Sequence, residues 1–128
     1  MADSFVSESF CIYAEIEREG YGYGMGMYAP DTALMQSLRD RMLARPKLFL
    51  SLVNTKEFAK TFTLEGVSYK RPKYPDAGEL SPYLNMRSIS FCFRCAELKN
   101  TLEPSLAQEI EHGFLLLKPV YRFLMGLE

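Results

Sequence analysis

The sequence lacks tryptophan, has one histidine and three cysteines, and carries almost no net charge. Its single histidine, His112, excludes any reaction centre that needs two histidines. The odd and sparse set of cysteines is not typical of a secreted disulfide scaffold, and it favours reduced thiols. Fifteen basic and 16 acidic residues leave a formal charge of −1. This balance argues against a protein whose main task is to grip the phosphates of a nucleic acid.

The sequence also lacks long apolar runs. None approaches the roughly 18 residues that a membrane-spanning helix needs, and the first residues do not have the basic flank and apolar stretch of a signal peptide. We therefore expect a cytoplasmic protein without a membrane partner. What the chain does have is 128 residues with 48% hydrophobic and 24% charged side chains, enough for one core. This composition predicts a single α+β domain over residues 1–128. Leu127 and Glu128 match the start of an appended tag and are given no weight.

Two alternating segments near the N-terminus predict an antiparallel hairpin. Residues 10–17 alternate with the period of a half-buried strand. Residues 21–28 alternate Tyr or Met with glycine, and Gly20 suits the tight turn between the two strands. A glycine-rich run that binds a dinucleotide would lie between a strand and a helix, whereas this run lies within a strand. The bare positions are therefore expected to let a helix or an aromatic ring approach the sheet closely.

Apolar residues at helical spacing predict several helices after the hairpin. Asp31 is the expected N-cap of a helix over 32–45, in which Arg39, Asp40 and Arg41 are left for solvent. Two shorter helices are expected, at 47–53 after Pro46 and beyond the cap Asn54-Thr55.

The second half of the chain is predicted to begin with a segment that is neither helix nor strand. Residues 64–84 are punctuated by glycine and proline, which indicates a long ordered loop. A third strand is expected over 85–96. A long helix is expected from Asn100 to the C-terminus, either kinked or broken near Pro119. Together these elements predict a mainly antiparallel twisted sheet with helices packed on one face.

The spacing of Cys92 and Cys95 is that of half a zinc or redox motif. Cys11 and His112 would complete a set of three cysteines and one histidine, and whether these residues meet in space stays open. In a strand, however, residues three apart point to opposite faces, and no helix follows to lower a thiol pKa. We favour buried apolar thiols and a structural or exposed histidine, and we expect neither a metal nor a cofactor.

The segment Tyr69–Tyr74 interleaves cations with aromatic rings, in the order Tyr-Lys-Arg-Pro-Lys-Tyr. Such a pattern suits a phosphate, a carboxylate or a single nucleic-acid strand, through ion pairs and stacking. The plainer interpretation is a solvated loop stiffened by proline. The predicted ligand-binding residues are Lys70, Arg71, Lys73, Tyr74 and, from the next strand, Arg87, with Arg94 as a further candidate. Tyr13, Tyr21 and Tyr23 would be the aromatic wall beside such a site, but a place in the core or on the sheet surface is the favoured interpretation of these tyrosines.

Several segments, in their order and spacing, resemble one known family. They are Ile12–Ile16, Gly24–Pro30, Leu34–Arg45, Leu64–Gly66 followed by Tyr69–Pro72, Tyr83–Ile89 and Leu117–Leu124. Gly24–Pro30 resembles the family's glycine-containing run that ends in an aromatic, a variable residue and proline. Leu64–Gly66 with Tyr69–Pro72 resembles the family's glycine followed by a Leu-Lys-Arg-x-Pro loop. The family is domain of unknown function 2461, which comprises uncharacterised proteins of bacteria and fungi.

The resemblance implies an α+β fold and brings no activity, cofactor or partner with it. Members of the family carry a further helix and a basic segment before the first strand. By this resemblance the chain is either the C-terminal portion of a larger module or a shortened relative. In both cases a site that uses the basic segment would be incomplete.

Three functions stay open at this point, and whether the protein is an enzyme is among the open questions. The leading hypothesis is a domain of unknown function that binds an anionic small molecule or nucleic acid through Tyr69–Tyr74. The second is a metal-assisted hydrolase or nuclease that uses carboxylates such as Asp76 or Glu79. The third is a structural module that forms a homo-oligomer through its many aromatic and methionine side chains.

Overall fold

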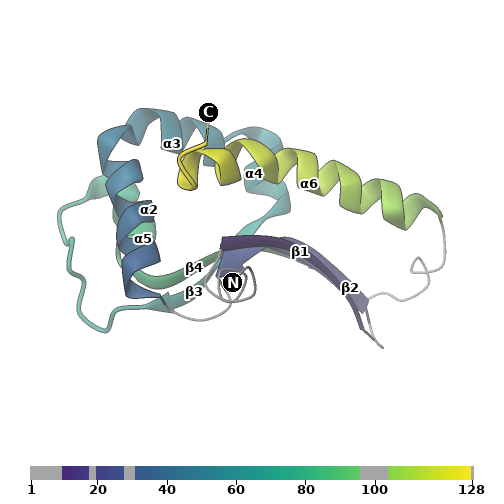
Figure 1. Ribbon diagram of the computed structural model, residues 1–128, viewed down its shortest axis with the longest axis horizontal. Coiled ribbons are helices and arrows are strands. Elements are labelled where there is room, and N and C mark those ends of the chain that lie inside the picture. The colour runs from purple at the N-terminus through teal and green to yellow at the C-terminus, as the bar shows by residue number, and fades with distance from the viewer. Residues whose placement is uncertain (1–9, 18–19, 28–30, 96–103, 128) are drawn as a thin grey trace, which may run out of the picture.

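The computed structural model describes residues 10–17, 20–27, 31–95 and 104–127 (Figure 1). They form a four-stranded antiparallel sheet with helices packed on one of its faces. The predicted α+β class is therefore confirmed. In the described ranges, no helix combines the length and the apolar character that crossing a bilayer requires.

The sheet has the strand order β1-β2-β4-β3. Strands β1 (Phe10–Glu17) and β2 (Gly20–Met27) form the predicted hairpin, and β4 (Met86–Cys95) pairs with the other edge of β2. Gly20 belongs to β2, whereas the rest of the predicted turn lies outside the described residues. Strand β2 is therefore enclosed between two neighbours, and this matters for its glycines.

The helices begin where the sequence places their caps. The carboxylate of Asp31 accepts a hydrogen bond from the Leu34 N–H at 2.9 Å, and the Thr55 hydroxyl accepts one from the Phe58 N–H at 3.3 Å. The start that the sequence predicts for the C-terminal helix, near Asn100, lies outside the described residues. The helices are α2 (Thr32–Ala44), α3 (Pro46–Val53), α4 (Lys56–Thr61), α5 (Ser81–Leu84) and α6 (Pro104–Leu124).

The predicted loop over residues 64–84 is wrong in part. Strand β3 (Thr63–Ser68) pairs with β4, and the one-turn 3-10 helix η1 (Gly78–Leu80) leads into α5. Because β3 is an edge strand whose side chains are exposed or half-buried, it shows none of the alternation by which a strand is predicted. The true loop is therefore shorter and runs between β3 and η1.

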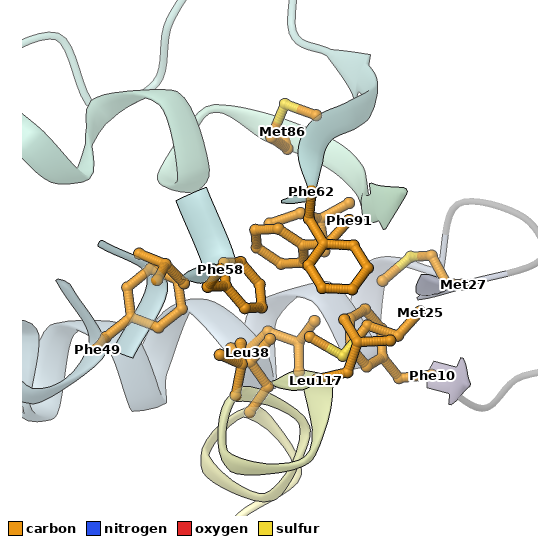
Figure 2. Close-up of a cluster of buried hydrophobic side chains, with 14 of the residues drawn as sticks. Phe10, Met25, Met27, Leu38, Phe49, Phe58, Phe62, Met86, Phe91 and Leu117 are labelled. Carbon is orange, nitrogen blue, oxygen red and sulfur yellow. The ribbon is translucent and has the colours of Figure 1, made fainter. Parts of the chain in front are cut away.

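The core lies between the sheet and the helical layer. Tyr21 and Tyr23 of β2 are buried there, and α6 approaches so closely that a Cβ on Gly113 would meet the Tyr23 ring at 2.1 Å. The core reading of these two tyrosines is thus confirmed. Figure 2 shows the centre of the cluster, in which Phe58 and Phe91 lie near Leu38 and Leu117. The labelled members are Phe10, Met25, Met27, Leu38, Phe49, Phe58, Phe62, Met86, Phe91 and Leu117.

The opposite face of the sheet carries Tyr13, so Tyr13, Tyr21 and Tyr23 do not form the single aromatic wall that a ligand site would use. Tyr13 pairs with Gly24, whereas Tyr21 and Tyr23 alternate with the glycines and point to the helices. The Tyr13 hydroxyl lies 3.1 Å from Cys92 Sγ, and Cys92 pairs with Gly24 from the other side. The side chain of Tyr13 therefore crosses β2 over a bare glycine. This confirms that the glycines admit an aromatic ring.

Helix α6 runs without a break through Pro119, so of the two expected alternatives, a kink or a break, the break near Lys118 is wrong. Proline has no N–H to donate, which leaves the carbonyl of Leu115 without its helical partner. We predict that Pro119→Ala raises the free energy of unfolding by about 1–2 kcal/mol, less than the full helix propensity difference because proline also restricts the unfolded chain. Urea unfolding followed by circular dichroism measures this. Lys118→Ala is the control, and a loss of stability in Pro119→Ala would contradict the prediction.

Candidate functional site

The segment Tyr69–Tyr74, called the basic loop below, is held at both ends by Asn85. The Tyr69 N–H donates to the Asn85 carbonyl at 3.0 Å. The Tyr74 N–H donates to Asn85 Oδ1 at 2.8 Å, and Asn85 Nδ2 donates to the Tyr74 carbonyl at 3.1 Å. Asn85 is itself buried directly before β4, where Nδ2 also donates to the Ser81 carbonyl at 2.9 Å. The loop is therefore fixed at its base, and Lys70, Arg71, Pro72 and Lys73 lie between the fixed points.

Arg39 of α2 lies beneath this anchor and is only 3% exposed. Its Nε donates to the Leu84 carbonyl at 2.9 Å and its Nη2 to the Met86 carbonyl at 2.6 Å, so it binds the main chain on both sides of Asn85. Nη2 also donates to the Tyr69 hydroxyl at 3.0 Å. The expectation that Arg39 faces solvent is therefore wrong. These acceptors belong to segments 30 to 47 residues away, which local spacing does not show.

A local signal for Arg39 does exist. It stands four residues after Met35 and three before Met42, both of which are buried, so the helical spacing places it on the buried face of α2. No comparable signal marks Asn85, because its partners come from the loop and from α5. Asp40, by contrast, is exposed as predicted.

Tyr69 lies close to two cations. Lys73 Nζ lies 4.4 Å from the centroid of its ring, and the guanidinium carbon of Arg39 lies 5.4 Å from it. Burial raises the pKa of the Tyr69 phenol, but the charges of Arg39 and Lys73 and the hydrogen bond from Arg39 outweigh it. The pKa of Tyr69 is therefore lowered from its usual value. Burial instead raises the pKa of Tyr83, and that of Tyr23 to about 12.

Four of the predicted ligand-binding residues, Lys70, Arg71, Lys73 and Arg87, are exposed. In the part of the chain that the structure describes, none of them makes an ion pair with a carboxylate. Of these four residues, only Lys73 contacts another residue of the loop, because its ammonium group lies over the Tyr69 ring. The positive charge of the loop is therefore left to solvent.

Arg87, Tyr74 and Arg94 are placed differently from one another. Arg87 lies at a β-bulge, because Val67 pairs with Ser88 while Ser68 pairs with Met86. The side chain of Tyr74 is half-buried and packs against the core, so it offers little ring surface for stacking. Nη1 of Arg94 donates to both carboxylate oxygens of Glu65, at 2.6 and 2.8 Å. Arg94 therefore belongs to the sheet surface.

The candidate metal residues do not gather. Cys92 pairs with Gly24 and Cys95 with Tyr21, so the two thiols point to opposite faces, as the strand period predicts. Burial raises the pKa of the Cys92 thiol, with a smaller opposing effect of its hydrogen bond with Tyr13. Among the described residues, no three His, Cys, Asp or Glu side chains are placed to hold a metal ion. His112 Nε2 lies 3.5 Å from a carboxylate oxygen of Glu57 at the surface, and Asp76 and Glu79 are exposed.

Comparison with known proteins gives one match. A family model described as a conserved hypothetical protein (DUF2461) matches residues 4–123. Neither the curated proteins nor the solved structures contain a match to this chain. The matched range includes every strand and all of α6 except its last residue, so it covers the loop and its anchors as well.

Proposed function

Because this chain belongs to the DUF2461 family of conserved hypothetical proteins, whose description names no activity, we propose a function from its geometry. The chain binds an anionic, phosphate-bearing ligand at the basic loop. The ligand is a nucleotide or a short nucleic-acid strand, and it contacts Lys70, Arg71 and Lys73, with Arg87 at the margin.

One observation carries this proposal: a fixed loop presents exposed cations that pair with no carboxylate of the described residues. A mobile surface loop would lose conformational entropy when it closes on a ligand. Here Asn85 and Arg39 have already ordered the base of the loop, so less entropy remains to be lost.

The chemistry of the loop agrees with a phosphate. Lysine ammonium and arginine guanidinium groups make charge-assisted hydrogen bonds to phosphate oxygens, and guanidinium can bind two of them at once. The buried Arg39 adds a further positive charge beneath the loop. The net charge of −1 for the whole chain does not oppose this, because solvent screens charges more than about 8–10 Å apart at physiological salt.

Amide NMR shifts during titration with ATP and with a short oligothymidylate test this proposal. In the wild type we expect shifts at residues 69–74 and at Arg87, and binding that weakens as salt is added. Lys70→Glu combined with Arg71→Glu should weaken binding about tenfold or more, since two attractive charges become repulsive.

The matched control combines Lys47→Glu with Lys60→Glu, which reverses two exposed charges of α3 and α4, outside the loop and its anchors. It should leave the affinity within about twofold of the wild type, apart from the general change in net charge. Absence of shifts at the loop, or equal weakening by the control, would refute the proposal.

A further inference from the structure

A hollow of about 580 Å³ lies between α2, α3 and the C-terminal half of α6. In Figure 1 the C-terminal end of α6 lies beside α3 in the helical layer. The volume falls within the range of roughly 300–1,000 Å³ typical of small-molecule sites. None of its lining residues belongs to the basic loop or its anchors. It is therefore a separate place on the molecule, here called the α2–α6 pocket.

The floor of the α2–α6 pocket is apolar. Its apolar lining includes Leu48 and Leu52 of α3, Pro119 and Phe123 of α6, and Ala44 of α2. The three larger floor side chains Leu48, Leu52 and Phe123 are only half-buried. Apolar surface left in contact with water is unfavourable, and contiguous apolar surface of this kind marks binding sites.

Basic side chains form the rim of the same pocket. Among the residues that the structure describes, its charged lining residues are Arg41, Arg45, Lys118 and Arg122, with no Asp or Glu. Arg41 is fixed in place, because its Nη1 donates to the Leu124 carbonyl at 2.6 Å. It is half-buried, so the expectation that it is left for solvent is wrong. Lys118 and Arg122 stand one helical turn apart on α6 and pair with no described carboxylate.

Helix geometry explains part of this arrangement. Cations near the C-terminal ends of α2 and α6 are stabilised by the helix dipoles, which accounts for Arg41 and Arg122. It does not account for an open apolar floor beside them. An adjoining hollow of about 360 Å³ shares Lys118 and Arg122 but is also lined by Glu111, which would repel an anion.

We propose that the α2–α6 pocket binds an aliphatic carboxylate, with the hydrocarbon chain on the floor and the carboxylate at Lys118 and Arg122. Only a ligand that is both apolar and anionic complements both parts of the pocket. An alcohol of the same length would satisfy the floor alone, and inorganic phosphate would satisfy the rim alone. This site is independent of the function proposed above.

Titration with decanoate below its micelle concentration, followed by amide NMR shifts, tests this inference. We expect shifts at Ala44, Leu48, Leu52 and Phe123, and binding about tenfold tighter than that of decanol. Lys118→Glu combined with Arg122→Glu should remove this preference for the acid. Ala44→Phe should fill the pocket and abolish binding of both ligands. Because Ala44 is exposed, this variant should keep the urea midpoint of the wild type.

The matched control is Lys70→Glu combined with Arg71→Glu, which should leave decanoate binding unchanged. Conversely, the Lys118 and Arg122 variant should still bind ATP, so failure at one site is distinguishable from failure at the other. Equal affinity for decanoate and decanol, or no shifts at the pocket, would overturn the inference. So would co-sedimentation with phosphatidylglycerol vesicles without decanoate binding, because the anionic partner would then be a lipid surface.

Discussion

Replacing Arg39 by methionine is expected to lower the free energy of unfolding by roughly 3 kcal/mol. Methionine keeps most of the apolar length of the side chain, but it leaves the carbonyls of Leu84 and Met86 buried without their donors. Each buried acceptor that loses its partner costs about 1–3 kcal/mol. Urea unfolding followed by circular dichroism measures the change.

Lys47→Met is the matched control for this substitution. It removes an exposed helix cation and should change the unfolding free energy by no more than about 0.5 kcal/mol. Similar values for the two variants would mean that the hydrogen bonds of Arg39 add little to stability, and the anchoring role of Arg39 would have to be abandoned.

The same Arg39→Met variant should raise the pKa of Tyr69. The positive charge and the hydrogen bond that favour the phenolate are lost, whereas the burial that opposes it remains. Titration of Tyr69 by carbon-13 NMR, with Tyr69→Phe to assign its signal, measures this. An unchanged Tyr69 pKa would contradict the geometry. If Arg39 positions the loop, the ATP affinity should also fall, although Arg39 is too deeply buried to touch the ligand.

The second large effect is expected from Gly24→Ala, which should lower the free energy of unfolding by about 3 kcal/mol or more. A Cβ at this position would lie 2.2 Å from the carbonyl oxygen of Phe91. That oxygen belongs to the backbone of β4, and β2 cannot retreat because β1 pairs with its other edge. Overpacking of this kind typically costs about 1–3 kcal/mol, and more when a backbone must move. The added methyl group would also obstruct Tyr13 on its way to Cys92.

Gly78→Ala is the informative comparison, measured in the same urea experiment. Gly78 has a φ of 62°, but a Cβ there would meet nothing within 4 Å. Its substitution therefore reports the backbone cost alone, about 1–2 kcal/mol. If Gly24→Ala were no more destabilising than Gly78→Ala, close approach of the strands would not explain the glycines of β2.

Local patterns were sufficient for much of this fold. The alternation of residues 10–17 and 21–28 predicts a hairpin, and Asp31 and Thr55 mark helix starts, because both signals depend only on neighbours along the chain. The cations of the basic loop are equally visible in the sequence. The charge of these cations predicts that they are exposed, but it does not by itself predict a function for them.

The features that only the tertiary structure decides all depend on distant partners. Strand β3 exists because β4 offers it an edge, although its own residues carry no alternation. Arg39 is buried because carbonyls from the far half of the chain converge on it, and Asn85 anchors the basic loop for the same reason. The basic residues of α2 and α6 form one rim only after the helices have packed. The sequence by itself thus determined the charges and most of the elements. The packing decided which of those charges meet and where β3 forms, because pairing, hydrogen bonds and pocket rims join residues that no local period connects.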